Sequence, residues 1–176
     1  MDSRKTRLIW TEDPVDTYVI SLDEVFWGGL LIALTMAIHG MGMLATLRVS
    51  DSLNVRFEQS QSFVSGIGII ILASLLIVLT NLVEVILWST FFVLQGASPN
   101  HSVAVYDALL NYSTLQAGYL PQRWRLLEGL LGMAGLLTMA WSTGVLYMLA
   151  DDFQQKQMRI LKQKRESHSR RARAKP

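Results

Sequence analysis

Three long apolar segments dominate the pattern of hydrophobic and polar positions along the chain. The first runs from Val25 to Leu47, the second from Phe63 to about Leu94, and the third from Trp124 to Ala150. With a helical rise of about 1.5 Å per residue, each can cross a hydrocarbon core of about 30 Å. The pattern therefore predicts an all-α membrane protein with three transmembrane helices.

A shorter half-apolar segment lies between the second and third spans. Ser98-Pro99 is typical of a helix start with proline in the first turn, and Ser102 to Tyr112 gives about 16 Å of helix, half of a bilayer. Its polar side chains make it a poor lipid-facing helix, but non-helical backbone at membrane depth is tolerated where protein or water surrounds it. We expect one re-entrant helix and loop here rather than a fourth span.

The ends of the chain differ from this apolar middle. Ser21 and Glu24 have the spacing of a capping box, which predicts a helix start at the membrane interface. A cleaved signal peptide fits less well, because the first apolar segment is longer than a usual signal h-region. Residues 1–24 are then an N-terminal tail, 25–150 the transmembrane domain and 151–176 a basic tail. Within that tail we expect residues 151–166 to continue the third helix and residues 167–176 to be disordered.

Positive charge is concentrated after Ala150. Because Lys and Arg accumulate on the cytoplasmic side, the C-terminus is predicted to be cytoplasmic and, with three spans, the N-terminus outside. The short segment should then enter from the outside. We expect the basic tail to meet anionic lipid headgroups rather than nucleic acid, since it lacks interleaved aromatic residues.

Composition narrows the chemistry that the chain can perform. Hydrophobic residues make up 51% of it, and it contains no cysteine, which removes disulfides, thiolate catalysis and cysteine-based metal sites. Its histidines are widely separated in sequence, and it has neither a Gly-rich phosphate loop nor a cluster of metal ligands. We therefore expect no enzyme activity, no cofactor and no metal site.

Residues 104–143, AVYDALLNYSTLQAGYLPQRWRLLEGLLGMAGLLTMAWST, resemble the bacterial potassium-channel-like proteins of the ion channel 2 type. In that family a pore helix leads into T-L-G-Y-G-D, followed by P-x-x-W-R-L-L and an inner helix ending G-W-S-T. His39-Gly40 is similar to the family's H-G-x-G in span one, and residues 82–88, LVEVILW, to its H-L-L-E-I-x-L-W in span two. The matching positions in the pore segment are Tyr106, Tyr112, Thr114, Leu115, Gly118, Pro121, Trp124, Arg125, Leu126, Leu127, Trp141, Ser142 and Thr143.

The resemblance implies a pore-loop cation channel in the bacterial inner membrane, built as a homotetramer that conducts monovalent cations. The implied filter consists of Ser113, Thr114, Leu115, Gln116, Ala117 and Gly118. Gln116 and Ala117 stand where the family has Gly and Tyr. The Gly permits left-handed backbone, so that successive carbonyls face the axis, and another residue there costs about 1–2 kcal/mol in each subunit.

Two functions remain open on this sequence. Because the filter reads TLQAG, we expect a weakly selective or non-selective channel. The alternative is a non-conducting accessory subunit that retains the channel fold among unlike membrane subunits.

His39 and Glu84 are ionisable residues that lie deep inside the predicted spans, away from their ends. Centring each span on the bilayer separates them by on the order of 10 Å along the axis, so direct pairing is not expected. We expect His39 to be a neutral ring between helices. Glu84 should accept hydrogen bonds from Tyr112, Ser113 or Gln116, so Glu84 and Tyr112 are the candidate supports of the loop.

The third span carries Gly129, Gly132 and Gly135 at every third position, a spacing that permits close helix packing or bending. Ala140 replaces the Gly that the family has before W-S-T. Gly135 and Gly144 are therefore the candidate positions for a hinge or for close packing.

Overall fold

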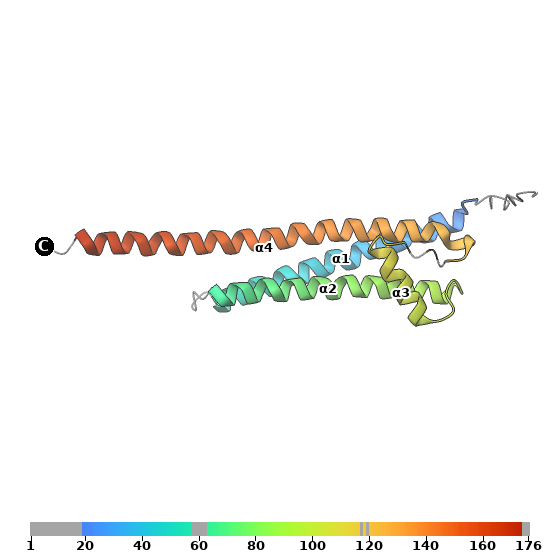
Figure 1. Ribbon diagram of the computed structural model, residues 1–176, viewed down its shortest axis with the longest axis horizontal. Helices are drawn as coiled ribbons and strands as arrows, with labels where there is room; N and C mark the ends of the chain where they lie inside the picture. Colours follow the sequence, from blue (N-terminus) through green and yellow to red (C-terminus); the bar gives the residue numbers. More distant parts are fainter. Residues whose placement is uncertain (1–18, 58–62, 117, 119, 174–176) are drawn as a thin grey trace, which may run out of the picture.

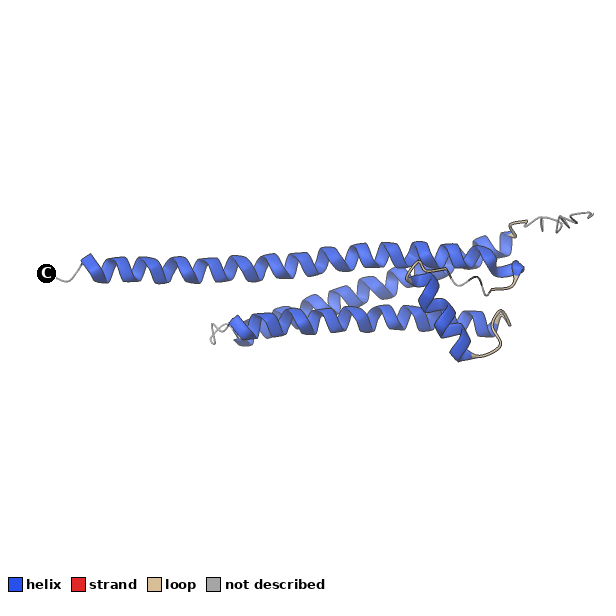
Figure 2. Cartoon of the chain, in the orientation of Figure 1, coloured by secondary structure: helices blue, strands red, loops and turns tan. Residues whose placement is uncertain are grey.

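The chain is helical throughout most of its described length. The computed structural model describes residues 19–57, 63–116, 118 and 120–173. Its elements are α1 Leu22–Phe57, α2 Phe63–Leu94, α3 His101–Tyr112, the 3-10 turn η2 Gln122–Trp124, and α4 Arg125–Arg173. The described residues contain no strand, so the prediction of an all-α fold is confirmed for this part of the chain (Figure 2).

Helices α1, α2 and α4 are each long and apolar enough to cross a membrane. Helices α1 and α2 form an antiparallel hairpin, α4 packs along both, and α3 lies against α2 and α4 near one end of the bundle (Figure 1). Large apolar side chains cover the outer faces, with examples in Leu75, Val78, Leu79 and Ile86, each more than half exposed. Such a surface suits a multi-pass membrane protein, because lipid or further chains can cover it.

Two helices extend beyond their predicted ends. Helix α1 continues past Leu47 to Phe57, and α4 is helical to Arg173, so the expectation of disorder from Ser167 is wrong as far as Arg173; residues 174–176 lie outside the described residues. Between Ala150 and Arg173 there is no Gly or Pro to end the helix, and Gln, Lys, Arg and Leu are good helix formers.

Glu24 secures the starts of two helices. The backbone N–H of Ser21 donates to Glu24 Oε2 at 3.1 Å, and the N–H of Asp23 donates to Ser21 Oγ at 3.2 Å, so the predicted capping box is present. Glu24 Oε1 also accepts the N–H of Leu126 at 3.3 Å in the first turn of α4. One carboxylate thus stabilises the N-terminal ends of α1 and α4, where its negative charge favours both helix dipoles.

Helix α3 begins later than Ser98-Pro99 predicts. Its N-cap is Asn100, whose side chain accepts the N–H of Val103 at 2.9 Å, a bond that satisfies one of the free donors of the first turn. Its buried residues recur at helical spacing: Ala104, Asp107, Ala108, Asn111 and Tyr112. In Figure 1, α3 slants from the end of α2 back across the bundle, and the following segment returns to the end where α4 begins.

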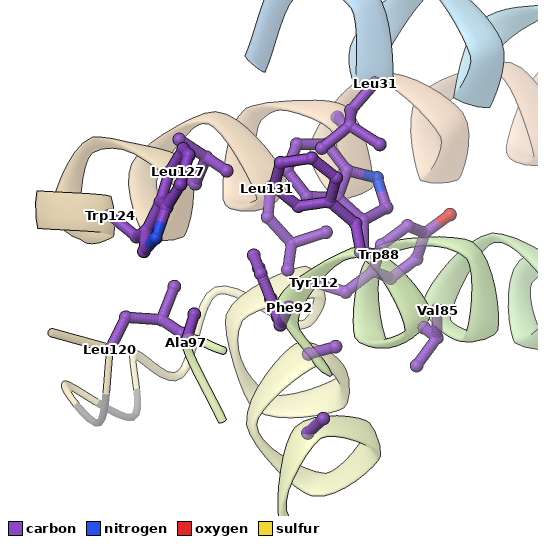
Figure 3. Close-up of a cluster of buried hydrophobic side chains, with 14 residues drawn as sticks. Leu31, Val85, Trp88, Phe92, Ala97, Tyr112, Leu120, Trp124, Leu127 and Leu131 are labelled. Atoms are coloured by element: carbon purple, nitrogen blue, oxygen red, sulfur yellow. The ribbon is translucent and has the colours of Figure 1, made fainter. Parts of the chain in front are cut away.

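Two apolar clusters hold the bundle together. The larger one surrounds α3 and is built mainly from the side chains of Trp88, Phe92, Trp124, Leu127 and Leu131 (Figure 3). The smaller one packs α1, α2 and α4 together nearer the α1–α2 connection and contains Met43, Ala73, Ile77, Val145 and Leu149. A layer of buried polar side chains lies between the two clusters.

Candidate functional site

The C-terminal end of α3 rests directly on α4. A Cβ on Gly135 would collide with the carbonyl oxygen of Tyr112, and one on Gly132 would lie 3.3 Å from the carbonyl oxygen of Asn111. Gly135 is therefore a close-packing position, because only a missing side chain lets these backbones approach. A Cβ on Gly129 or on Gly144 would meet nothing within 4 Å.

The loop after α3 has left-handed backbone at alternate positions. The φ angles are 66° at Thr114, 43° at Gln116 and 67° at Gly118, whereas Leu115 has a negative φ. Gln116 thus has the left-handed backbone that Gly adopts most readily, at a cost of roughly 1–2 kcal/mol. Ala117, the other departure from the family pattern, lies outside the described residues.

The start of the loop is tied to the last turn of α3. The backbone N–H of Thr114 donates to Asn111 O at 2.9 Å, and that of Leu115 donates to Leu110 O at 2.9 Å. These bonds satisfy the final carbonyls of α3. The side chains of Thr114, Leu115 and Gln116 are exposed on this single chain.

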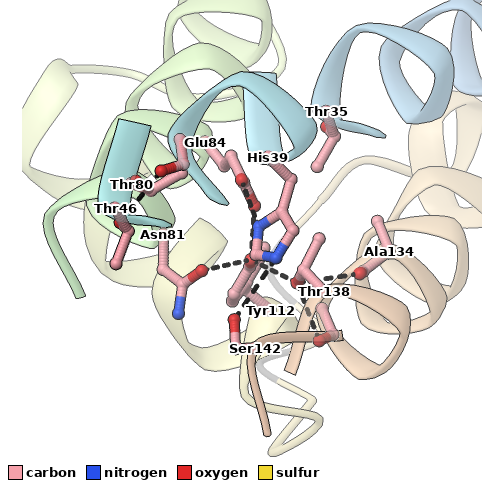
Figure 4. A network of polar contacts seen from close by, with 12 residues as sticks. Thr35, His39, Thr46, Thr80, Asn81, Glu84, Tyr112, Ala134, Thr138 and Ser142 are labelled. Atoms are coloured by element: carbon pink, nitrogen blue, oxygen red, sulfur yellow. Dashed lines mark hydrogen bonds and ion pairs between the residues drawn. The ribbon is translucent and has the colours of Figure 1, made fainter. Parts of the chain in front are cut away.

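Below the loop, buried side chains of all four helices form one polar network (Figure 4). His39 Nδ1 lies 2.9 Å from Glu84 Oε1, and the Tyr112 hydroxyl donates to Glu84 Oε2. The Tyr112 hydroxyl also contacts Thr138 Oγ1, and Ser142 Oγ lies 3.3 Å from His39 Nε2. His39, Glu84 and Thr138 are 0% exposed, Tyr112 2% and Ser142 5%, so water from the chain's surface does not screen these contacts.

The expectation that His39 and Glu84 do not pair directly is wrong. Centring each span separately on a bilayer ignores the short connection that sets the register of the α1–α2 hairpin. His39 lies 18 residues before Phe57 and Glu84 lies 21 residues after Phe63, so both are almost equally far from that connection. Counted this way, their offset along the axis is only about 5 Å, which side chains can bridge.

The predicted hydrogen bond from Tyr112 to Glu84 is present. Ser113, another expected donor, instead bonds through its hydroxyl to the carbonyl oxygen of Leu109. The Tyr112 hydroxyl also lies 3.4 Å from Asn81 Oδ1. Glu84 therefore meets the last residue of α3, directly before the loop, rather than the loop itself.

Two members of the network, Thr138 and Ser142, were not predicted as site residues. Both lie on the face of α4 that carries Gly135, three and seven residues after it, so the helical period was the available signal. Trp141 packs its ring against His39, with the ring centres 5.6 Å apart. Nearer the loop end of the bundle, Trp88 Nε1 donates to Thr35 Oγ1 at 2.9 Å and joins α2 to α1.

A second buried carboxyl lies on α3. Asp107 Oδ1 accepts from Asn111 Nδ2 at 3.1 Å, whereas Asp107 Oδ2 has no hydrogen-bond partner among the described residues. Burial, reinforced by the Glu128 carboxyl, raises the pKa of Asp107 to about 6. Glu128 itself accepts the N–H of Leu120 at 2.9 Å, which secures the returning end of the loop segment to α4.

Comparison of the chain with protein-family models, with curated proteins and with solved structures finds no match. Within the described residues, no group of three or more His, Asp or Glu side chains could hold a metal ion. Function is therefore inferred from the geometry of the loop, α3 and the buried network.

Proposed function

We propose that the chain is one subunit of a tetrameric, weakly selective cation channel, with α3 as its pore helix and residues 113–118 as its filter. The observation that carries this proposal is the left-handed backbone at Thr114, Gln116 and Gly118. Left-handed residues at every second position help to turn carbonyls toward one side, as a filter that replaces the hydration shell of a cation requires. Thr114 is the left-handed residue that caps α3, whereas the strained backbone at Gln116 lies beyond that cap and favours a functional reason for the loop's shape.

The depth of α3 supports the same proposal. Its last residue meets Gly135, ten residues into α4, and Glu84, ten residues before the end of α2. Both counts put the tip of α3 about 15 Å below the helix ends, half of a hydrocarbon core of about 30 Å. In the proposed channel α3 is a re-entrant helix, and its C-terminal dipole end favours a cation in the cavity.

A pore requires further copies of the chain, because one loop cannot surround an ion. Helix α4 leaves one face exposed for this purpose, and the residues along it are Gly129, Met133, Leu136, Ala140 and Gly144. In a fourfold assembly this face would line the cavity or meet a neighbouring subunit. The exposed side chains of the loop would then converge on the axis.

Orientation and location follow from charge in this proposal. The basic C-terminal part of α4 would lie in the cytoplasm, and α3 would enter a bacterial inner membrane from the outside. Phe153 packs against Gly66 near the α1–α2 connection, and α4 continues for about 30 Å beyond it. Anionic lipid headgroups would meet the first turns of this extension, while its end would reach further into the cytoplasm.

One observation favours the alternative, a non-conducting accessory subunit beside unlike chains. Ala117 provides no aromatic ring to brace the loop, and the exposed side chain of Gln116 could close the axis by hydrogen bonding to its copies. The exposed face of α4 would serve equally well as a contact with unlike subunits.

Reconstitution with subunit counting tests the proposal. The purified chain, placed in bilayers under a sodium/potassium gradient, should give currents that reverse near zero voltage. A cysteine introduced at Gly144, in a chain that has none of its own, should crosslink chains in pairs, and the mass of the intact complex in detergent should correspond to four chains. No current, together with a single copy beside unlike subunits in the native membrane, would replace the channel with the accessory role.

A further inference from the structure

The buried network is a continuous hydrogen-bonded chain that passes through every helix of the bundle. It runs from Ser142 to His39, from His39 to Glu84, and from Glu84 to Tyr112. One end, Ser142, is buried on the side of α4 that faces His39 of α1. The other end is Tyr112, the last residue of α3, so the network joins α1, α2 and α4 to the base of the loop.

The network offers two positions for an additional proton, His39 Nε2 and Glu84 Oε2. With neutral imidazole, His39 Nδ1–H donates to Glu84 Oε1, the Tyr112 hydroxyl donates to Oε2, and the pair carries one negative charge. An added proton on Nε2 would donate to Ser142 Oγ. On Oε2 it would donate to Tyr112, whose own O–H could then turn to Asn81 Oδ1 at 3.4 Å. In the Oε2 arrangement each of these donors meets an acceptor, which keeps the cost of protonating the carboxyl small.

The groups that contact His39 and Glu84 come from all four helices. Helix α1 contributes His39 and α2 contributes Glu84, while α4 faces them with the neutral hydroxyls of Thr138 and Ser142. Tyr112 is the ionisable group that α3 brings into contact with the pair. Asp107 lies more than a turn earlier on α3, where Asn111 and Glu128 are its neighbours.

We propose that His39 and Glu84 form a proton-binding pair that controls the loop through Tyr112. In the ionised state the bond from Tyr112 to Glu84 is charge-assisted and holds the end of α3 firmly. Protonation of the carboxyl replaces it with a neutral bond, and the loop loosens. In a conducting tetramer the proton also removes a negative charge at the base of the proposed filter, so acid lowers cation occupancy. Only this last consequence rests on the proposed channel function.

Cysteine labelling measures the loop without any need for conduction. Leu115→Cys places one reporter on the loop, where the native side chain is 69% exposed, and Leu161→Cys places a control on the distant part of α4, at 54%. The loop-to-control ratio, the labelling rate of the first variant divided by that of the second, cancels the intrinsic pH dependence of the thiol. In nanodiscs we expect this ratio to rise by about fivefold or more from pH 8 to pH 5, the lower end of typical coupling between two sites.

Three variants separate proton binding from its effect on the loop. Glu84→Gln and His39→Gln should flatten the pH response of the loop-to-control ratio. Tyr112→Phe should flatten it too, but should keep the carboxyl infrared band that titrates in the parent and that Glu84→Gln removes. A flat labelling response with an intact carboxyl band would show that Tyr112 transmits proton binding to the loop rather than only stabilising the fold.

Each result decides the proposal. A parent ratio that is constant between pH 5 and pH 8, a parent without a titrating carboxyl band, or a pH response that survives in Glu84→Gln would overturn it. A pH-dependent loop in a chain that passes no current would uphold the proton pair and defeat the channel function.

Discussion

At the scale of single residues, Glu84 has the most demanding position in the bundle. It is fully buried between His39 and Tyr112 and accepts a hydrogen bond on each carboxyl oxygen. Removing it takes this acceptor from two buried donors, and a buried donor left unsatisfied costs about 1–3 kcal/mol. The residue therefore matters as an acceptor for groups on two helices, α1 and α3.

We predict that Glu84→Ala lowers the free energy of unfolding by at least about 1–3 kcal/mol, because the donors of Tyr112 and His39 lose their partner. Glu84→Gln should cost less, since the amide oxygen still accepts one bond. Thermal unfolding in detergent measures both variants. Equal stabilities close to that of the parent would show that the carboxylate does not support α3.

Asp107 should make the stability of the fold depend on pH. Its pKa rises from 3.8 in the unfolded chain to about 6 in the fold, so folding becomes less favourable as pH rises through this window. Asp107→Asn removes this titrating group. The change that it causes in the free energy of unfolding should be more favourable at pH 8 than at pH 4, by about 1–3 kcal/mol. Melting curves of both chains at the two pH values test this, and an equal effect at both would mean that Asp107 ionises freely in the fold.

At the scale of elements, the sequence predicted most of the helices but not how they align. The apolar segments identified all three long helices, and Ser21 with Glu24 identified the start of α1. The contact between His39 and Glu84 was missed because a bilayer-centred count treats each span independently, whereas the hairpin connection fixes their register. Thr138 and Ser142 of α4, the partners of Tyr112 and His39, were missed because a hydroxyl within an apolar helix gives no sign of what it faces.

The contact between α3 and α4 depends on Gly135, and Gly144 provides a matched control on the same helix. A Cβ at Gly135 would strike the backbone of Tyr112, which cannot move aside as a flexible side chain can. Gly135→Ala should therefore destabilise the bundle by about 1–3 kcal/mol despite the better helix propensity of Ala. Gly144→Ala, which has open space, should stabilise it by up to about 1 kcal/mol.

Thermal unfolding of the two glycine variants provides the measurement. If both gained stability equally, α3 would not be packed against α4 as described. Gly135→Ala could instead lose stability and, in combination with Leu115→Cys, increase the rate at which the loop is labelled. That result would show that the packing of α3 against α4 holds the loop in place.

At the scale of the whole molecule, the backbone of the loop after α3 favours a pore, whereas the residues at positions 116 and 117 do not. Gln116 has left-handed backbone, the conformation that Gly adopts most readily, although Gln is strained there. The sequence does not reveal that the fold holds Gln116 in this conformation. The local backbone bonds from Thr114 and Leu115 to the end of α3 fix where the loop begins.

The double variant Gln116→Gly with Ala117→Tyr tests whether the surrounding pore is intact. It removes the strain at position 116 and restores an aromatic ring next to it, so narrow carbonyl rings should be easier to hold. In bilayers under a sodium/potassium gradient, we expect the parent to reverse near zero voltage and the variant to shift toward the potassium equilibrium value. A parent that already reverses at that value would show that the carbonyl rings hold potassium spacing with Gln in place of Gly. A current from the variant alone would show that the bundle, α3 and the buried network still form a channel scaffold, which Gln116 and Ala117 keep from conducting.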